Sequence, residues 1–242
     1  MSKSFIATSL CERAVTLTLL FAGGTGCFDF DALTNGGDRT VTVDAGADLV
    51  PHLPETCSNL VDGQQILFIS ADPTRPWTAR CAGGLTYLPL VHTGSDANYS
   101  QYKAGGYSPG QDVVTAYTAV RLDPASLLVD VSDQTFSTSS GSLRGAGASV
   151  VTMPYGVAMD CVSKQTATGK ANIDLRGTSF TIRNNVFVAG GLQTASTVAL
   201  ASDAKVANLS GGGECGWMAA GSYSGGPVNK AGGFQLPLQY QP

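Results

Sequence analysis

Six cysteines divide this chain of 242 residues into a short N-terminal segment and a larger remainder. Cys11 and Cys27 lie in, or directly after, an apolar stretch near the start of the chain. The other four are spread through the rest: Cys57, Cys81, Cys161 and Cys215. An even set of four cysteines in an exported domain favours two disulfides, and three pairings are open. We therefore expect a domain held together by two bridges.

The first residues have the layout of an export signal. Lys3 and Arg13 supply positive charge, residues 14–22 are apolar, and small residues occupy 23–26. The apolar run is shorter than the roughly 18–20 residues that a membrane-spanning helix needs. Residues 1–26 are therefore predicted to be a secretory signal peptide.

Cys27 has two interpretations. In a bacterial-type lipoprotein, a cysteine that follows a small residue such as Gly26 becomes the acylated first residue of the mature chain. The alternative is an ordinary signal, cleaved nearby, which leaves Cys27 as a thiol. We favour lipidation, because a free thiol in an oxidising compartment would otherwise need a partner. The lipid would attach the protein to a membrane of the cell envelope or cell surface; without it, the protein would be secreted.

Composition divides the remaining chain into a tether and a domain. After Cys27, residues 28 to about 53 are polar and Gly-rich, as in a flexible linker, so 27–54 is predicted to be a lipidated cysteine and tether. About 190 residues remain for one domain, 55–242. Charged residues make up only 13% of the chain, the formal net charge is −4, and no basic cluster occurs. This distribution argues against a nucleic-acid partner.

Short apolar or alternating runs bounded by turn residues predict strands rather than helices. These runs are 66–69, 113–122, 127–131, 172–175, 180–182, 186–188, 198–200, 205–209 and 234–240. Residues 172–175 and 180–182 are predicted to form a hairpin, and Gly84 to Gly110 a loop region. The expected fold is mostly β: a single antiparallel-strand domain with two disulfides, long loops and little helix.

Two stretches of sequence carry a family resemblance. The first contains Cys57-Ser58-Asn59-Leu60, the run Trp77-Thr78-Ala79-Arg80-Cys81, and Thr86-Tyr87-Leu88-Pro89-Leu90 before Asn98-Tyr99. The second contains Pro154-Tyr155-Gly156-Val157-Ala158-Met159-Asp160-Cys161 and Asn172-Ile173-Asp174-Leu175-Arg176-Gly177-Thr178. Over about residues 55–241 the chain resembles the GON domain, the C-terminal module of some secreted ADAMTS metalloproteases. The resemblance implies an extracellular module with no well-defined biochemical activity, here as a stand-alone bacterial-type lipoprotein.

The order of the strands favours one disulfide pairing. Cys57 and Cys81 flank the predicted hairpin of strands near 66–69 and 77–80, so their ends should meet, and Cys161 and Cys215 then pair by exclusion. The other two pairings would join strands more distant in sequence. Each bridge is worth roughly 3–4 kcal/mol by the chain-entropy argument.

The sequence motifs of a zinc protease and of a Ser-His-Asp hydrolase do not occur in a fitting context, although Ser and Asp are plentiful. A catalytic zinc needs three well-placed ligands, but the chain has only His52 and His92 and no His-Glu-x-x-His. Gly221 to Gly225 matches the letters of a hydrolase elbow only within a Gly-rich stretch. We therefore assign no catalytic residue, no metal site and no cofactor. A structural calcium is a weaker alternative that rests on turn aspartates: Asp62, Asp72, Asp96, Asp112, Asp123 and Asp203.

A concentration of aromatic and amide residues is the candidate binding surface. It comprises Tyr87, His92, Asn98, Tyr99, Tyr102 and Tyr107. Such residues in loops suit glycan or protein contact, and alanine at Tyr102 or Tyr107 should then leave stability intact. The alternative is that Tyr87 and Tyr99 fill the core. The leading hypothesis is a non-catalytic adhesion or recognition module; the alternatives are an envelope hydrolase and a purely structural lipoprotein.

Overall fold

The computed structural model describes residues 52–145, 147–162, 166–192, 195–221 and 235–242. The predicted signal peptide, Cys27 and nearly all of the tether lie outside these residues. Within them the chain is almost entirely β, with a single 3-10 turn at Ile69–Ala71. No helix in this part is long and apolar enough to cross a membrane. The predicted fold class, mostly antiparallel β with two disulfides, is confirmed.

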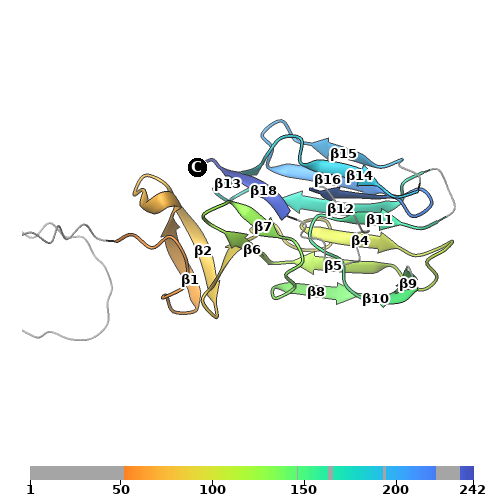
Figure 1. The fold of residues 1–242 in the computed structure, drawn as a ribbon, viewed down its shortest axis with the longest axis horizontal. Coiled ribbons are helices and arrows are strands. Elements are labelled where there is room, and N and C mark those ends of the chain that lie inside the picture. Colours follow the sequence, from red (N-terminus) through yellow and green to blue (C-terminus); the bar gives the residue numbers. More distant parts are fainter. Residues whose placement is uncertain (1–51, 146, 163–165, 193–194, 222–234) are drawn as a thin grey trace, which may run out of the picture. The chain divides into compact units, whose positions relative to one another are not determined.

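The first sheet has the strand order β1-β2-β3-β6-β7-β18-β13 (Figure 1). The bounds of these strands are Gly63–Phe68 (β1), Pro76–Ala82 (β2), Leu85–Pro89 (β3), Ala119–Asp123 (β6), Leu128–Asp130 (β7), Phe180–Ile182 (β13) and Gln235–Tyr240 (β18). The two ends of this sheet approach each other. The ring of Trp77 in β2 packs edge-on against Phe180 in β13, with ring centroids 5.1 Å apart.

The second sheet has the order β14-β17-β11-β4-β12-β16-β15, with β5 on β4 and β8 on β5. Its bounds are Tyr99–Lys103 (β4), Val113–Tyr117 (β5), Ser137–Ser140 (β8), Ala158–Asp160 (β11), Gly169–Asp174 (β12), Phe187–Gly190 (β14), Thr197–Leu200 (β15), Val206–Gly211 (β16) and Trp217–Ala220 (β17). A separate ribbon joins Leu143–Gly145 (β9) to Ala148–Val150 (β10). Among the described strand pairs, β11 with β4 is parallel and the others are antiparallel.

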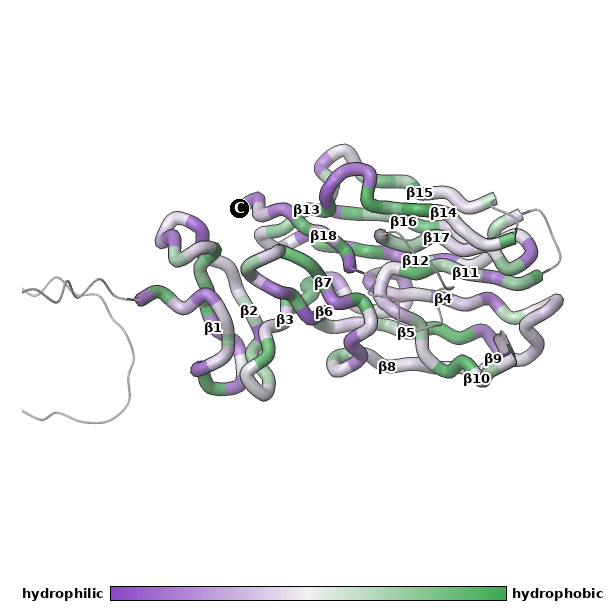
Figure 2. The backbone as a smooth tube through the Cα atoms, viewed as in Figure 1, coloured by the Kyte–Doolittle hydropathy of each residue, from purple (hydrophilic) through white to green (hydrophobic). Residues whose placement is uncertain are grey.

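Buried apolar side chains from both sheets form one core. Along most strands the hydrophobic and hydrophilic residues are mixed, as expected where one face packs inward (Figure 2). In β5, Val113, Thr115 and Tyr117 are buried and the residues between them are half-buried. The alternation of buried and half-buried residues therefore shows which face of the strand packs against the core.

Glycines allow the backbones of β12 and β16 to lie very close to that of β11. Gly169 and Gly211 are directly opposite each other in the β12–β16 ladder. A Cβ on Gly169 would overlap the carbonyl oxygen of Met159, and one on Gly211 would overlap that of Ala158. Neither position can therefore accept a side chain without moving the backbone of β11.

Both disulfides of the sequential pairing are present. Cys57–Cys81 ties the segment before β1 to β2, and Cys161–Cys215 ties the residue after β11 to the segment before β17. β1 and β2 form the expected hairpin, with Gly63 opposite Cys81. The reasoning that the ends of this hairpin should meet is therefore confirmed.

Three local predictions were wrong. β12 and β13 do not form a hairpin: β12 pairs with β4 and β16, whereas β13 pairs with β18 in the other sheet, where Phe180 reaches Trp77. The run 113–122 is two strands in different sheets, because a bend at Thr118 puts the adjacent Ala119 and Val120 both inside. The region Gly84 to Gly110 contains β3 and β4 rather than loops alone.

Candidate binding site

A row of polar side chains runs along one face of β12. Lys170, Asn172 and Asp174 alternate with buried Ala171 and Ile173, so the three share a face. The neighbouring strands extend this row. We call the whole set the polar face: Tyr99 and Gln101 of β4, Lys170, Asn172 and Asp174 of β12, and Asn208 and Ser210 of β16.

Hydrogen bonds across the strands hold the polar face in place. The Lys170 Nζ donates to Ser210 Oγ over 2.7 Å, and Asn172 Nδ2 donates to Asn208 Oδ1 over 2.8 Å. Lys170 and Asn208 are exposed, whereas Asn172 is 6% exposed and lies lower in the face. The exposed side chains of the polar face are therefore open to a ligand, and the buried Asn172 beneath them is held in place.

The polar face ends in a hollow of about 630 Å³. One wall is the loop 91–97, and the opposite side is formed by β12, β16 and Arg176. We call it the polar hollow; its lining is Val91, His92, Thr93, Gly94, Ser95, Asp96, Ala97, Asn172, Asp174, Arg176, Val206 and Asn208. This lining consists mainly of amide, hydroxyl and charged groups, which favours a hydrogen-bonding ligand over an apolar one.

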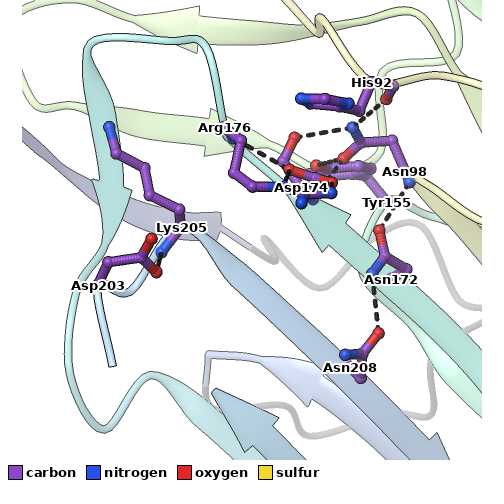
Figure 3. A network of polar contacts seen from close by, with 9 residues as sticks. All are labelled: His92, Asn98, Tyr155, Asn172, Asp174, Arg176, Asp203, Lys205 and Asn208. Atoms are coloured by element: carbon purple, nitrogen blue, oxygen red, sulfur yellow. Dashed lines mark hydrogen bonds and ion pairs between the residues drawn. The ribbon is translucent and has the colours of Figure 1, made fainter. Parts of the chain in front are cut away.

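Asn98 is the hub that joins the loop 91–97 to β12 (Figure 3). Its Nδ2 donates to the carbonyls of His92, at 2.7 Å, and Asp174, at 2.8 Å. Its Oδ1 accepts the Tyr155 hydroxyl at 2.5 Å and the Asp174 N–H at 2.8 Å, and its own N–H donates to Asn172. All side-chain donors and acceptors of the buried amide are therefore used.

The backbone of Asn98 also requires this residue type. Its φ is +54°, in the left-handed region, which asparagine tolerates better than most residues. Tyr155, which donates to it, is fully enclosed, and burial, followed by the nearby Asp174 charge, raises the pKa of its hydroxyl well above the ordinary value. Tyr155 is therefore a neutral donor at any physiological pH.

Asp174 and Arg176 form the charged part of the polar hollow (Figure 3). The Arg176 Nε donates to both carboxylate oxygens, at 2.9 and 3.0 Å, and Nη2 makes a second bond to Oδ2. Burial pushes the pKa of Asp174 up, but the Arg176 side-chain and backbone hydrogen bonds outweigh it and leave the pKa below the ordinary value. The Arg176 side chain is 55% exposed. The ion pair thus fixes an accessible guanidinium at the rim.

The polar hollow presents several kinds of hydrogen-bonding group. Fixed amide, carboxylate and guanidinium groups can hold hydroxyls through several hydrogen bonds at once. Within the described residues, no three His, Cys, Asp or Glu side chains gather in a way that could hold a metal ion. Three of the turn aspartates considered for calcium, Asp72, Asp123 and Asp203, accept hydrogen bonds from backbone N–H groups two residues further on.

The chain matches a known domain family. Residues 95–226 match the family model of the GON domain. The chain belongs to the GON domain family. No curated protein and no solved structure matches it.

The GON match includes most of the polar face and hollow. It begins within the loop 91–97 and contains β4, β12 and β16. The strands β1, β2 and β3, with the Cys57–Cys81 bridge, precede it. The polar hollow therefore lies mostly within the GON segment. Of its lining residues, only Val91 to Gly94 precede that segment.

The six residues predicted as one binding surface do not form one. Tyr87, Asn98 and Tyr102 are each at most 1% exposed, so they cannot contact a large ligand. Tyr87 donates weakly to Asp133 and Thr135, and Tyr102 bonds Ser108 and Cys161, because buried phenol groups need partners. The expectation that alanine at Tyr102 leaves stability intact conflicts with this burial.

The structure brings three of the six together. His92 lines the polar hollow, Asn98 lies buried beneath it and donates to the His92 carbonyl, and half-buried Tyr99 shares the polar face through its position opposite Asn172. Tyr107 is 62% exposed but lies elsewhere, where its hydroxyl reaches Glu214 at 3.5 Å. The sequence reasoning missed Asn172, Asp174, Arg176 and Asn208. The polar alternation of β12 was a sequence signal for Asn172 and Asp174, whereas Arg176 follows that strand and Asn208 lies on β16.

Proposed function

We propose that this GON domain is a non-catalytic recognition module that binds a glycan along the polar face. The observation that carries the proposal is the polar hollow, whose shape is fixed by the Asn98 network before any ligand arrives. A preformed site loses little conformational entropy on binding. The exposed groups of the polar face and the polar hollow supply hydrogen-bond donors and acceptors at several points, as a polyhydroxylated chain requires. These groups are Lys170, Asn208 and Arg176.

The proposed location is outside the cell or at its surface. The predicted signal peptide, residues 1–26, and acylation of Cys27 would hold the domain at a membrane by a tether of residues 27–54. The two disulfides support this location, because such bridges persist in oxidising compartments. Mass spectrometry of the mature N-terminus tests the anchor: a diacylated or triacylated Cys27 is expected, and an unmodified terminus at another residue would contradict it.

A glycan array tests the binding proposal. The full chain should bind a restricted set of glycans, and the double variant Lys170→Ala/Asn208→Ala should bind them at least about tenfold more weakly, because each lost hydrogen bond is worth about 1 kcal/mol. The matched control is Ser140→Ala/Arg144→Ala, two exposed positions on β8 and β9.

The outcomes separate the proposal from its alternatives. Binding retained by the control and lost by the double variant, with equal melting temperatures, supports a glycan site on the polar face. No binding to any glycan, or equal loss in both variants, overturns it. Capture of an unglycosylated protein in place of glycans would also overturn it.

A further inference from the structure

The two disulfides differ in their access to solvent. In the first bridge, Cys57 and Cys81 are 0% and 1% exposed. In the second, Cys161 is 3% exposed, whereas Cys215 is only half-buried. A disulfide is opened by a thiolate that must reach one of its two sulfur atoms. The second bridge therefore offers an approach, from the side of Cys215.

Tyr102 directs a buried hydroxyl at the other half of this bridge. The hydroxyl donates to Cys161 Sγ over 3.1 Å and lies 2.7 Å from Ser108 Oγ. A disulfide sulfur carries no proton, so Tyr102 is the donor to Cys161, and Ser108 then donates to Tyr102. Tyr102 and Ser108 are 1% and 0% exposed. The two hydroxyls therefore form a buried chain of hydrogen bonds that ends on Cys161.

The hydrogen bond to Cys161 becomes stronger when the bridge opens. A neutral sulfur is a weak acceptor, whereas a thiolate carries a charge and accepts strongly. The Tyr102 hydroxyl therefore stabilises the thiolate that forms when the S–S bond breaks more than it stabilises the closed bridge. Burial alone disfavours a thiolate, and the hydroxyl offsets this effect. A sulfur whose negative charge is stabilised leaves faster in thiol–disulfide exchange.

The backbone around Cys215 is held in an unfavourable conformation. Glu214 and Cys215 have φ angles of +47° and +64°, so two successive residues other than glycine lie in the left-handed region. The bridge to Cys161 and a hydrogen bond of 2.9 Å from the Gly213 N–H to Asp160 Oδ1 restrain this segment. Opening the bridge removes one of these restraints, so the left-handed residues can relax.

We propose that Cys161–Cys215 is a reducible bridge, which a dithiol reductant opens by thiol–disulfide exchange while Cys57–Cys81 stays closed. A thiolate of the reductant attacks Cys215 Sγ, the S–S bond breaks, and Cys161 leaves as a thiolate that accepts the Tyr102 hydroxyl. The second thiol of the reductant, deprotonated, then attacks the mixed disulfide and releases Cys215. Two electrons pass to the protein, the reductant becomes a disulfide, and its two protons go to the protein sulfurs or to solvent. The proposal does not depend on glycan binding.

The order in which the bridges of the full chain are reduced tests this proposal without any variant. Free thiols are blocked with N-ethylmaleimide, the folded chain is treated with dithiothreitol, and samples are alkylated with iodoacetamide and mapped by mass spectrometry. We expect Cys161 and Cys215 to be alkylated at least about tenfold faster than Cys57 and Cys81. Equal rates, or earlier opening of Cys57–Cys81, would overturn the proposal.

A monothiol identifies the sulfur that is attacked. After brief treatment with 2-mercaptoethanol, acid quenching and alkylation, we expect the mixed disulfide on Cys215 and the alkyl group on Cys161. The reverse pattern, with the mixed disulfide on Cys161, would contradict the assigned roles of the two cysteines.

The variant Tyr102→Phe keeps the buried ring and removes the hydroxyl. Cys161–Cys215 should then be reduced about tenfold more slowly, because a hydrogen bond to a developing charge is lost, and the rate for Cys57–Cys81 should not change. A purely structural role predicts the opposite sign, since losing a buried hydrogen bond loosens the domain and exposes the bridge. An unchanged or faster rate in Tyr102→Phe therefore overturns the proposal.

Tyr117→Phe is the matched control. Tyr117 is also 1% exposed, and its hydroxyl bonds to the Met153 carbonyl and to Gln134 rather than to a cysteine. This variant loses a buried hydroxyl at a distance from the bridge and should not slow the reduction of Cys161–Cys215. Equal slowing in the two variants would contradict a specific role of Tyr102.

Discussion

The polar hollow, of about 630 Å³, has a counterpart of about 540 Å³, but the polar groups around the two are paired differently. We call the second one the seam hollow; its lining includes Trp77, Arg80, Leu88 and Phe180. Beneath the polar hollow, Asn98 uses every donor and acceptor of its amide, and in the lining Arg176 pairs with the carboxylate of Asp174. At the seam hollow, within the part of the chain that the structure describes, Trp77 keeps a buried donor unpaired and Arg80 has no carboxylate partner.

The two hollows therefore differ in how their polar groups affect folding stability. A paired network fixes the shape of the polar hollow without a ligand and contributes to folding stability. An unpaired buried donor gives no such stabilisation, because burial removes its hydrogen bonds to water and nothing replaces them. Removing polar groups should therefore destabilise the protein at the first hollow and leave it unharmed at the second.

The largest expected effect is at Asn98. Asn98→Asp keeps the shape of the side chain but replaces two donated hydrogen bonds with a carboxylate facing the carbonyls of His92 and Asp174. Because this buries an uncompensated charge, we expect the free energy of unfolding at neutral pH to fall by about 3–5 kcal/mol, measured by urea denaturation.

Asn208→Asp is the matched control for that substitution. Asn208 is exposed, and an aspartate there can still accept the hydrogen bond from Asn172 Nδ2. Its free energy of unfolding should change by less than about 0.5 kcal/mol. Equal losses in the two variants would contradict the role of Asn98 as the hub.

The next effect is a change in pH dependence at Arg176. The folded-state pKa of Asp174 lies below its ordinary value, so its stabilisation is complete above that ordinary value and is lost as pH falls through the folded pKa. Arg176→Gln removes the hydrogen bonds from the guanidinium, so burial becomes the main influence on the pKa of Asp174 and raises it. The variant should therefore be less stable than the wild type near neutral pH, and the gap should close as pH falls to about 3.

Urea denaturation at both pH values measures this gap. Arg144→Gln, at an exposed position in β9, supplies the control and should show no pH-dependent difference from the wild type. A gap for Arg176→Gln that is constant over this range would mean that the Asp174–Arg176 pair does not set the pKa of Asp174.

The smallest effect is expected at Trp77. Replacement by benzothienylalanine keeps the shape of the ring system and removes the N–H. Because this N–H has no partner among the described residues, the free energy of unfolding should stay the same or rise by about 1 kcal/mol. Thermal denaturation followed by circular dichroism measures the change. A loss above about 1 kcal/mol would show that the N–H is paired in the free protein.

The sequence predicted the strands better than their partners. Apolar runs between turn residues such as Asp62-Gly63 and Asp123-Pro124 located β1, β6 and β7, because strand formation follows local alternation. The choice of partner strand depends on which sheet each strand joins. Thr118 and the turn after β12 send the chain from one sheet to the other, and no local pattern marks that change.

The site was less predictable for the same reason. Asn98 and Asp174 are 76 residues apart in sequence and meet only because β4 and β12 pair. The tyrosines were misleading, because a phenol group is equally suited to a surface and to a core with a partner for its hydroxyl. The disulfides were predictable, since a hairpin between Cys57 and Cys81 brings its own ends together.

Amide chemical-shift mapping tests the central claim, that the polar face is the binding site, most directly. The probe is the glycan bound most tightly on the array, titrated into the ¹⁵N-labelled full chain. We predict that the largest shifts fall on Tyr99 and Gln101 of β4, on residues 170–176 and on residues 206–210. Shifts confined to the seam hollow or to the β9–β10 ribbon would contradict the account.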